Sequence, residues 1–250
     1  MKIIAIVNQK GGVAKTTTAI NLGAALAQNG KKVLLVDADP QANLTAGLGI
    51  SPDKKTVYDC LVSELSLDEA IYATDIKGLD IVPANIQLAN AELELSNIFG
   101  RETLLRESME SNKLLYDYIL IDCNPSLGLL TVNALTACEG IIIPMEPSIF
   151  AFQGIDNLLK VVNLVKKKLN SRINIFGVLL TRVDSRTNIA KEFFEQLQEV
   201  FKEKLFETVI HQNVKITEAQ AEKKPILFFD SDSKGSKEYL QLSKEVINRG

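Results

Sequence analysis

Short, almost wholly apolar stretches recur along the chain, and longer segments with apolar residues every three or four positions separate them. The short stretches are rich in β-branched residues and have no polar face, which is typical of strands in a parallel sheet covered on both sides. They occupy residues 3–7, 33–36, 79–82, 118–121, 141–144 and 176–180. We therefore expect a buried, mostly parallel sheet.

The intervening segments predict helices. Residues 16–29, 127–138 and 153–169 place apolar side chains on one stripe, and Gly30 stands where helices often end. Alternation of strands and helices predicts an α/β fold with a doubly wound, mostly parallel sheet and helices on both faces. Residues 84–111 are more polar and are expected to pack beside the sheet, so we predict a single domain over residues 1–250.

Composition and charge indicate where the protein works and which partners it can attract. The chain has 250 residues, of which 46% are apolar, and a formal net charge of −3. No apolar run approaches the roughly 18 residues of a membrane span, and the first run is too short for a signal peptide. Three cysteines without a CxxC pair are expected to be buried thiols, so we predict a cytoplasmic protein. The charge gives no general attraction for nucleic acid, so DNA binding would need a local patch.

A glycine-rich loop joins the first strand to the first helix and predicts a phosphate site. Glycines let backbone N–H groups converge on an anion at a helix N-terminus. Lys15 would reach the β- and γ-phosphates, and the Thr16 hydroxyl would ligate Mg²⁺. The candidate nucleotide-binding residues are Lys10, Gly11, Gly12, Val13, Ala14, Lys15, Thr16 and Thr17.

Acidic residues follow two of the buried strands. Asp37 and Asp39 come after residues 33–36, and Asp122 comes after residues 118–121. The carboxyl ends of strands border the ligand crevice of an open α/β sheet. Asp122 therefore looks like the carboxylate that holds Mg²⁺ through a water. A plain strand cap remains the alternative for Asp37 and Asp39.

The loop departs from the ordinary G-x-x-x-x-G-K-[ST] pattern in an informative way. Gln9 stands where the first glycine belongs, Ala14 precedes the lysine, and a second lysine, Lys10, lies five residues before Lys15. This arrangement resembles the deviant Walker A loop of the ParA/MinD P-loop ATPases. Further matches make the resemblance closest to ParA/Soj-type partition ATPases; they lie at residues 37–45, 79–89, 122–135, 177–188 and 213–219.

The resemblance implies a P-loop NTPase fold, ATP/ADP and Mg²⁺ as cofactors, and slow ATP hydrolysis stimulated by a ParB-type partner. It also implies an ATP-dependent homodimer that binds DNA nonspecifically, and therefore a nucleoid-associated location. Catalytic roles fall to Lys15, to Lys10 across the dimer interface, and to Asp39 as the residue that orients water. Asp37 would support the loop and metal beside Thr16 and Asp122.

The same resemblance also assigns residues that would contact the adenine base and DNA. His211 and Asn213 would border the adenine, with Gln212 replacing an arginine of relatives. Arg186 and Lys215 would bind DNA, with Arg182, Lys204, Lys223 and Lys224 able to enlarge the patch. Each of these cations alone could equally be a solvated surface charge.

Two departures from the family pattern concern the site. Ala14 replaces a usual glycine, and we expect a negative φ there, so that the alanine costs little. Asn124 replaces a proline and should alter loop stiffness but not the metal site.

Two other functions remain open. A MinD-like membrane-surface ATPase would end in a basic amphipathic tail. Here Tyr239, Leu242 and Val246 share one face but lack a cationic flank, so we expect a helix docked on the domain and no membrane partner. A regulatory module that holds nucleotide but barely hydrolyses it is the other alternative, with Ala14 as its cause.

Overall fold

One eight-stranded sheet organises the chain in a computed structural model, which describes residues 1–63, 65–110, 115–148, 151–184, 186 and 188–250. The strand order is β3-β4-β2-β5-β1-β6-β7-β8, and β3 alone pairs antiparallel. The strands are β1 (Lys2–Ile6), β2 (Val33–Ala38), β3 (Tyr72–Ala73), β4 (Leu79–Val82), β5 (Tyr118–Cys123), β6 (Gly140–Met145), β7 (Asn174–Val183) and β8 (Leu205–His211).

The sequence pattern located the six inner strands and missed the two edge strands. β8 alternates buried and more exposed positions, with Glu207 facing solvent. Such an edge strand lacks the continuous apolar run that marks a strand covered on both faces. β3 has only two residues and carries no pattern.

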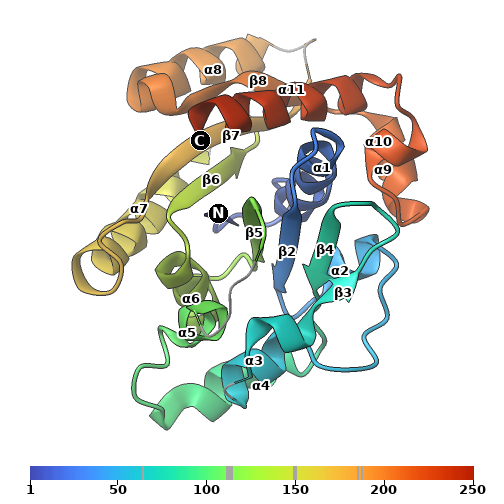
Figure 1. The fold of residues 1–250 in the computed structure, drawn as a ribbon. Helices are drawn as coiled ribbons and strands as arrows, with labels where there is room; N and C mark the ends of the chain where they lie inside the picture. Colours follow the sequence, from blue (N-terminus) through green and yellow to red (C-terminus); the bar gives the residue numbers. More distant parts are fainter. Residues whose placement is uncertain (64, 111–114, 149–150, 185, 187) are drawn as a thin grey trace.

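Helices cover both faces of the sheet, as predicted (Figure 1). Alternate residues of β1 show the division, because Ile4 and Ile6 join one apolar core and Ala5 joins the other. The Ile4 core includes α1 (Lys15–Gln28), α2 (Asn43–Gly47), α9 (Val214–Ala221), α10 (Ile226–Phe229) and α11 (Lys234–Arg249). The Ala5 core includes α3 (Val57–Val62), α4 (Leu88–Glu94), α5 (Leu104–Glu110), α6 (Leu129–Ala137), α7 (Ala151–Lys168) and α8 (Asn188–Phe201), with the short 3₁₀ turns η1 (Leu67–Ala70) and η2 (Leu95–Asn97). A third such turn, η3 (Lys202–Lys204), leads into β8.

Several local predictions are confirmed. Gly30 follows α1 with a φ of 78°, a left-handed conformation in which glycine is unstrained. The three cysteines are buried and free. Tyr239, Leu242 and Val246 are fully buried, so α11 docks its apolar face on the fold, beside α1 (Figure 1). Within the described parts of the chain, every helix is too short or too polar to cross a bilayer.

The sheet brings the predicted site residues to one edge. β1 runs directly into the glycine-rich loop, and Ile6 at its end lies in register with Asp122 of β5. Asp37 of β2 lies in register with the same Asp122. The loop and both acidic strand ends therefore meet at the carboxyl edge of the central strands.

Candidate functional site

Polar side chains hold the glycine-rich loop near each of its two ends. The Asn8 amide donates to the Pro144 carbonyl at 2.7 Å, and its oxygen accepts from the Lys10 N–H at 3.0 Å. The Thr181 hydroxyl lies 3.1 Å from the Val13 carbonyl oxygen. These contacts fix the loop to β6 and β7, so its N–H groups are positioned before any ligand binds.

Our expectation for Ala14 is wrong. The residue adopts φ 63° and ψ 34°, the left-handed conformation, and it stands immediately before α1. The chain must turn sharply there to enter the helix, and a glycine would do so without strain. For alanine this conformation costs on the order of 1 kcal/mol. The loop is formed nonetheless, because its surroundings hold it.

Lys15 lies in the first turn of α1 with its side chain largely buried. Its ammonium donates to the Lys10 carbonyl at 3.3 Å. Burial lowers the pKa of this lysine, against the opposing attraction of Asp122. A buried cation with one carbonyl partner is strongly favoured to meet an anion.

Asp122 is fully buried, and neither of its carboxylate oxygens has a hydrogen-bond partner within the described residues. Burial raises the pKa of this carboxyl well above its ordinary value, and the neighbouring Asp37 raises it further. The Thr16 hydroxyl is near enough to favour the charged form. An orphaned carboxylate beside a threonine hydroxyl fits a hydrated Mg²⁺, which prefers oxygen donors and retains waters.

Asp37 and Asp39, the other two acidic residues, accept hydrogen bonds from different parts of the chain. Asp37 accepts hydrogen bonds from the N–H and the hydroxyl of Thr45, at 2.9 and 2.6 Å, and from the Asp39 N–H at 3.2 Å. Burial raises its pKa to about 6 despite these bonds. Because both oxygens are engaged, Asp37 supports the segment from Asp39 to Thr45 and is not poised for direct metal contact. Asp39 uses one oxygen to cap the Gln41 N–H at 2.9 Å and lines the cavity above the loop.

A cavity of about 640 Å³ opens over the loop. Gly11, Gly12, Ala14, Lys15, Thr16, Thr17 and Asp39 line it. A smaller cavity of about 90 Å³ lies beside it, and Ala14, Thr17, Arg182 and Gln220 border both. His211 and Asn213 line only the smaller one. Most of the predicted phosphate residues and both predicted adenine residues thus line two neighbouring cavities.

Lys10 is not among the residues that line the two cavities, and its ammonium contacts other residues of its own chain. Its ammonium lies 3.8 Å from the Glu146 carboxylate and donates to the Ser148 hydroxyl at 3.2 Å. Glu146 also pairs with Arg182 at 3.3 Å. Sequence reasoning missed Glu146, although it follows a buried strand just as Asp37 and Asp122 do.

The two predicted DNA residues are exposed but paired. Arg186 binds the Asp184 carboxylate at 2.6 Å, and Lys215 binds Glu218 at 2.8 Å. Arg186 lowers the pKa of Asp184 to about 2. Ser185 and Thr187 of the same segment lie outside the described residues. Arg182, which we had grouped with this patch, lines both cavities instead.

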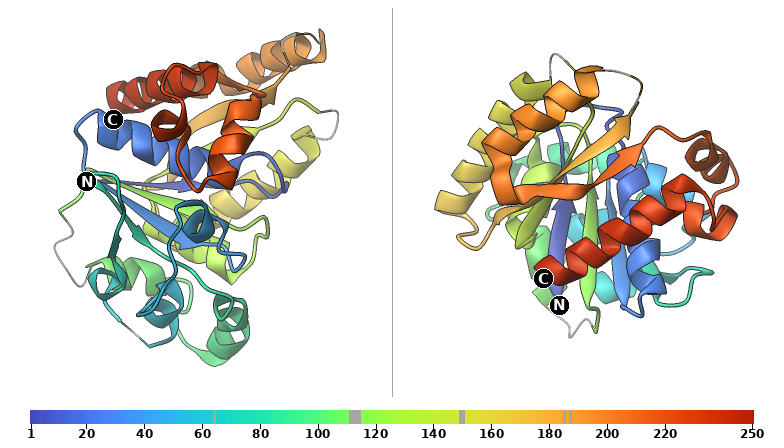
Figure 2. Two further views of the ribbon diagram at one scale, coloured as in Figure 1. Left: turned by 90° about the vertical axis from the view of Figure 1, so that its right-hand side faces the viewer. Right: turned by 90° about the horizontal axis from the view of Figure 1, so that it is seen from above.

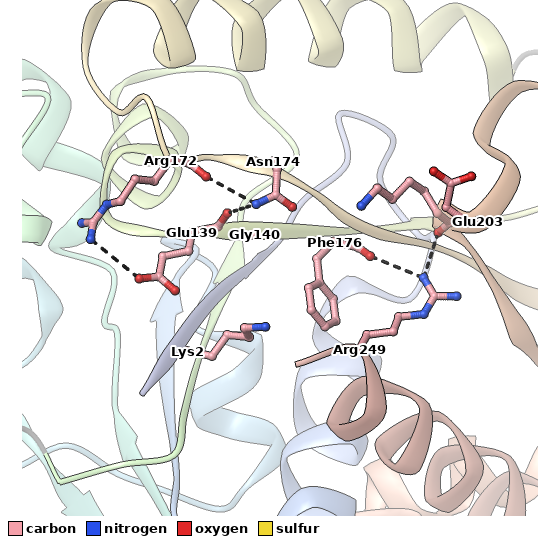
Figure 3. Close-up of a pocket in the computed structure, with 9 residues that line it drawn as sticks. Lys2, Glu139, Gly140, Arg172, Asn174, Phe176, Glu203 and Arg249 are labelled. Carbon is pink, nitrogen blue, oxygen red and sulfur yellow. Dashed lines mark hydrogen bonds and ion pairs between the residues drawn. The ribbon is translucent and has the colours of Figure 1, made fainter.

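A further cavity of about 580 Å³ lies at the opposite, amino edge of the sheet (Figure 3). Its polar groups mostly bind one another: Arg172 pairs with Glu139 at 3.8 Å, and the Asn174 amide donates to the Glu139 carbonyl at 2.9 Å. The Arg249 guanidinium donates to the carbonyls of Phe176 and Lys204. Lys204, which was predicted to enlarge the DNA patch, borders this cavity, whereas the predicted nucleotide and metal residues do not. We interpret it as a space left where the strand ends pack together.

Comparison with known proteins agrees with this geometry. The family model described as AAA domain matches residues 1–175. The chain is 50% identical to the sporulation initiation inhibitor protein Soj of Bacillus subtilis, over 100% of this chain and 99% of Soj. It is 44% identical to the chromosome partitioning protein ParA of Myxococcus xanthus, over 99% of this chain and 88% of ParA. A solved structure of cobyrinic acid a,c-diamide synthase from Mycobacterium smegmatis, with bound ATP analog and magnesium, superposes with a TM-score of 0.86 at 34% identity, covering 99% of this chain and 95% of that one. The chain therefore belongs to the Soj/ParA family of P-loop partition ATPases.

Proposed function

We propose that this chain is a single-domain partition ATPase in which Mg·ATP drives dimerisation and nonspecific DNA binding, and slow hydrolysis reverses both. The observation that carries the nucleotide part is that a buried Lys15 ammonium and a buried Asp122 carboxylate with no hydrogen-bond partner among the described residues lie near one another at the glycine-rich loop. The partition role is supported by the names of its relatives, Soj and ParA.

Each residue has a proposed task in this reaction. Phosphoryl transfer depends on positioning and charge neutralisation more than on covalent chemistry. Lys15 and the loop N–H groups bind the phosphates, and Asp39 orients the attacking water. Thr16 and Asp122 are the residues to hold Mg²⁺, which when bound neutralises charge on the phosphate oxygens. Asp37 holds the segment from Asp39 to Thr45 in place. Lys10 completes the nucleotide site of a second subunit.

DNA binding is proposed for the surface around Arg186 and Lys215. Both side chains are exposed, and their acidic partners are readily displaced, because solvent and salt screen ion pairs on the surface. A ParB-type protein is the proposed partner that stimulates hydrolysis, and the nucleoid in the cytoplasm is the proposed location. The docked apolar face of α11 favours this function over a membrane-surface one.

A cosedimentation assay tests the proposal. With Mg·ATP, the protein should sediment with DNA but not with anionic lipid vesicles. With ADP, it should sediment with neither. Lys15→Ala is the control, because loss of this point charge should abolish nucleotide binding. Vesicle binding that requires ATP would favour the membrane function instead, and phosphate release at the background rate would favour the regulatory module.

A further inference from the structure

A side chain of α9 reaches the glycine-rich loop from a distant part of the chain. The Gln220 amide donates to the Thr17 hydroxyl at 2.7 Å, although the two residues lie 203 positions apart. Thr17 stands in the first turn of α1, and Gln220 stands near the end of α9. Each of them borders both of the neighbouring cavities. The hydrogen bond therefore lies in a wall that the two cavities share, close to the loop that is proposed to hold the phosphates.

We propose that Gln220 is a positioning residue for nucleotide binding, which holds the Thr17 hydroxyl in the orientation that donates to a phosphate oxygen. This inference rests on the proposed function, because it assumes that ATP occupies the cavity over the loop. Thr17 is the residue that contacts the nucleotide, and Gln220 acts through it.

The chemistry of a hydroxyl group explains the effect. A threonine hydroxyl has one hydrogen and two acceptor sites, so an oxygen that accepts from an amide keeps its hydrogen for another acceptor. Without the amide, a threonine hydroxyl in a helix can turn to nearby backbone carbonyls. The bond from Gln220 restricts that rotation. Two hydrogen bonds in series, from the amide to the hydroxyl and from the hydroxyl to a phosphate, also strengthen one another.

The amide donor is itself held by packed parts of the fold. Ile216 and Ala219 of α9 are buried in the apolar core that includes α1. Just beyond α9, the Ile226 N–H donates to the Asn21 side-chain oxygen at 2.7 Å, and the Asn21 amide donates to the Thr17 carbonyl at 2.8 Å. Thr17 is thus tied to this segment through its carbonyl as well as its hydroxyl. The donor is in place before a nucleotide binds, as a positioning residue requires.

Equilibrium binding of Mg·ATP to the full chain tests the role, measured by displacement of a fluorescent ATP analogue. Gln220→Met keeps the length of the side chain but cannot donate, so it should weaken binding about fivefold. Gln196→Met is the matched control, because it makes the same change at an exposed position of α8 that borders neither cavity. The control should bind Mg·ATP normally. Unchanged affinity in Gln220→Met would overturn the proposal.

A double-mutant cycle tests whether Gln220 acts through the Thr17 hydroxyl. Thr17→Val removes the hydroxyl and should weaken binding about tenfold or more, because a hydrogen bond to a charged phosphate is lost. In that background, Gln220→Met should cost less than about twofold. Thr17→Ser retains the hydroxyl, so there Gln220→Met should again cost about fivefold. An equal cost with and without the hydroxyl would mean that Gln220 acts through the packing of α9 instead, and would overturn the proposal.

Steady-state hydrolysis gives a second readout. A hydroxyl that contacts a phosphate does so in the ground state and in the transition state alike. Gln220→Met should therefore raise the KM for ATP and leave kcat unchanged within about twofold. A fall in kcat at an unchanged KM would contradict a role in binding.

The outcomes separate this inference from the proposed function. If the unaltered chain does not bind Mg·ATP, the proposed function fails. If it binds Mg·ATP and Gln220→Met binds equally well, or if the loss does not depend on the Thr17 hydroxyl, only the role of Gln220 fails. Should Thr17→Val bind too weakly for titration, the comparison of Gln220→Met with Gln196→Met and the changes in KM and kcat still decide.

Discussion

The ammonium of Lys10 lies 3.8 Å from the carboxylate of Glu146 in its own chain. A lysine that is to act on a second subunit must leave this partner and the Ser148 hydroxyl first. Glu146 is about a third exposed, so the ion pair opposes release by no more than about 1 kcal/mol. If Lys10 acts across a dimer interface as proposed, the pair favours the monomer by this small amount and does not prevent the proposed dimer from forming.

Removing that bias should favour the dimer. Glu146→Gln should tighten ATP-dependent dimerisation up to about fivefold, because Lys10 then leaves a neutral side chain. Analytical ultracentrifugation across protein concentrations measures the change. Lys10→Ala is the control, since it should bind nucleotide nearly normally and fail to dimerise. A dimer that forms with ATP in Lys10→Ala would contradict the role across the interface.

The strain at Ala14 predicts a stabilising substitution. Ala14→Gly should raise Tm by up to about 3 °C, because glycine relieves about 1 kcal/mol of left-handed strain and loses part of it to unfolded-state freedom. Differential scanning calorimetry without nucleotide measures it. Ala27→Gly, inside α1, is the comparison and should lower Tm. If Ala14→Gly lowered Tm as much as Ala27→Gly does, the alanine at position 14 would be unstrained.

The buried acids predict how stability depends on pH. A carboxyl whose pKa is higher in the folded state binds its proton more tightly there, so stability falls as pH rises through the window between the two values. For Asp37 that window runs from its ordinary 3.8 to about 6. The pKa of Asp122 shifts in the same direction, so this carboxyl adds to the effect. Without ligand, the protein should be more stable at pH 5 than at pH 8.

Asp122→Asn should remove much of this dependence. Because the amide carries no buried charge, Tm at pH 8 without nucleotide should rise by about 3 °C or more, and Tm at pH 5 should change less. The same variant should lose the additional stabilisation that Mg²⁺ gives in the presence of ATP. Thermal scans at both pH values, with and without Mg·ATP, test both parts. A fall in Tm at pH 8 would show that the native carboxylate has a partner.

Asp39 has two candidate roles that one pair of variants separates. Asp39→Ala should reduce ATP hydrolysis about 100-fold and trap an ATP-bound dimer on DNA, because water is no longer oriented. Asp39→Asn keeps an oxygen to cap the Gln41 N–H but loses the charge. Phosphate release should be slow in both variants. Normal hydrolysis in Asp39→Asn would leave Asp39 as a cap only.

Charge reversal tests the DNA surface. Arg186→Glu and Lys215→Glu should each weaken DNA binding and lower the slope of log affinity against log salt by about one. ATP hydrolysis measured without DNA should not change. Lys167→Glu, in the exposed last turn of α7, makes the same change in net charge and should bind DNA normally. Unchanged slopes in both test variants would move the DNA surface elsewhere.

How far the sequence predicts this protein depends on the range of each interaction. The loop residues were predictable because strand, turn and helix are neighbours along the chain, and Asp122 because it follows an apolar strand whose end must lie at the carboxyl edge of the sheet. The partner of Lys10 was not, since Glu146 lies 136 positions away and meets it only when β1 and β6 pair. Nor was the φ of Ala14, which the entry into α1 imposes against the preference of alanine. The contact between the Glu238 carboxylate and His211 Nδ1, at 2.6 Å, needed the docking of α11.

Helix α11 also has a mechanical consequence. Its 16 residues extend about 24 Å. Glu238 near its start reaches the nucleotide edge, while Arg249 at its end donates to the Leu205 carbonyl at 2.7 Å on the opposite edge. Both termini meet at that opposite edge (Figure 2). A fluorescent protein fused after Gly250 could displace the end of α11, and the other end of this helix holds His211. Terminal tags should therefore alter nucleotide affinity unless a flexible spacer precedes them.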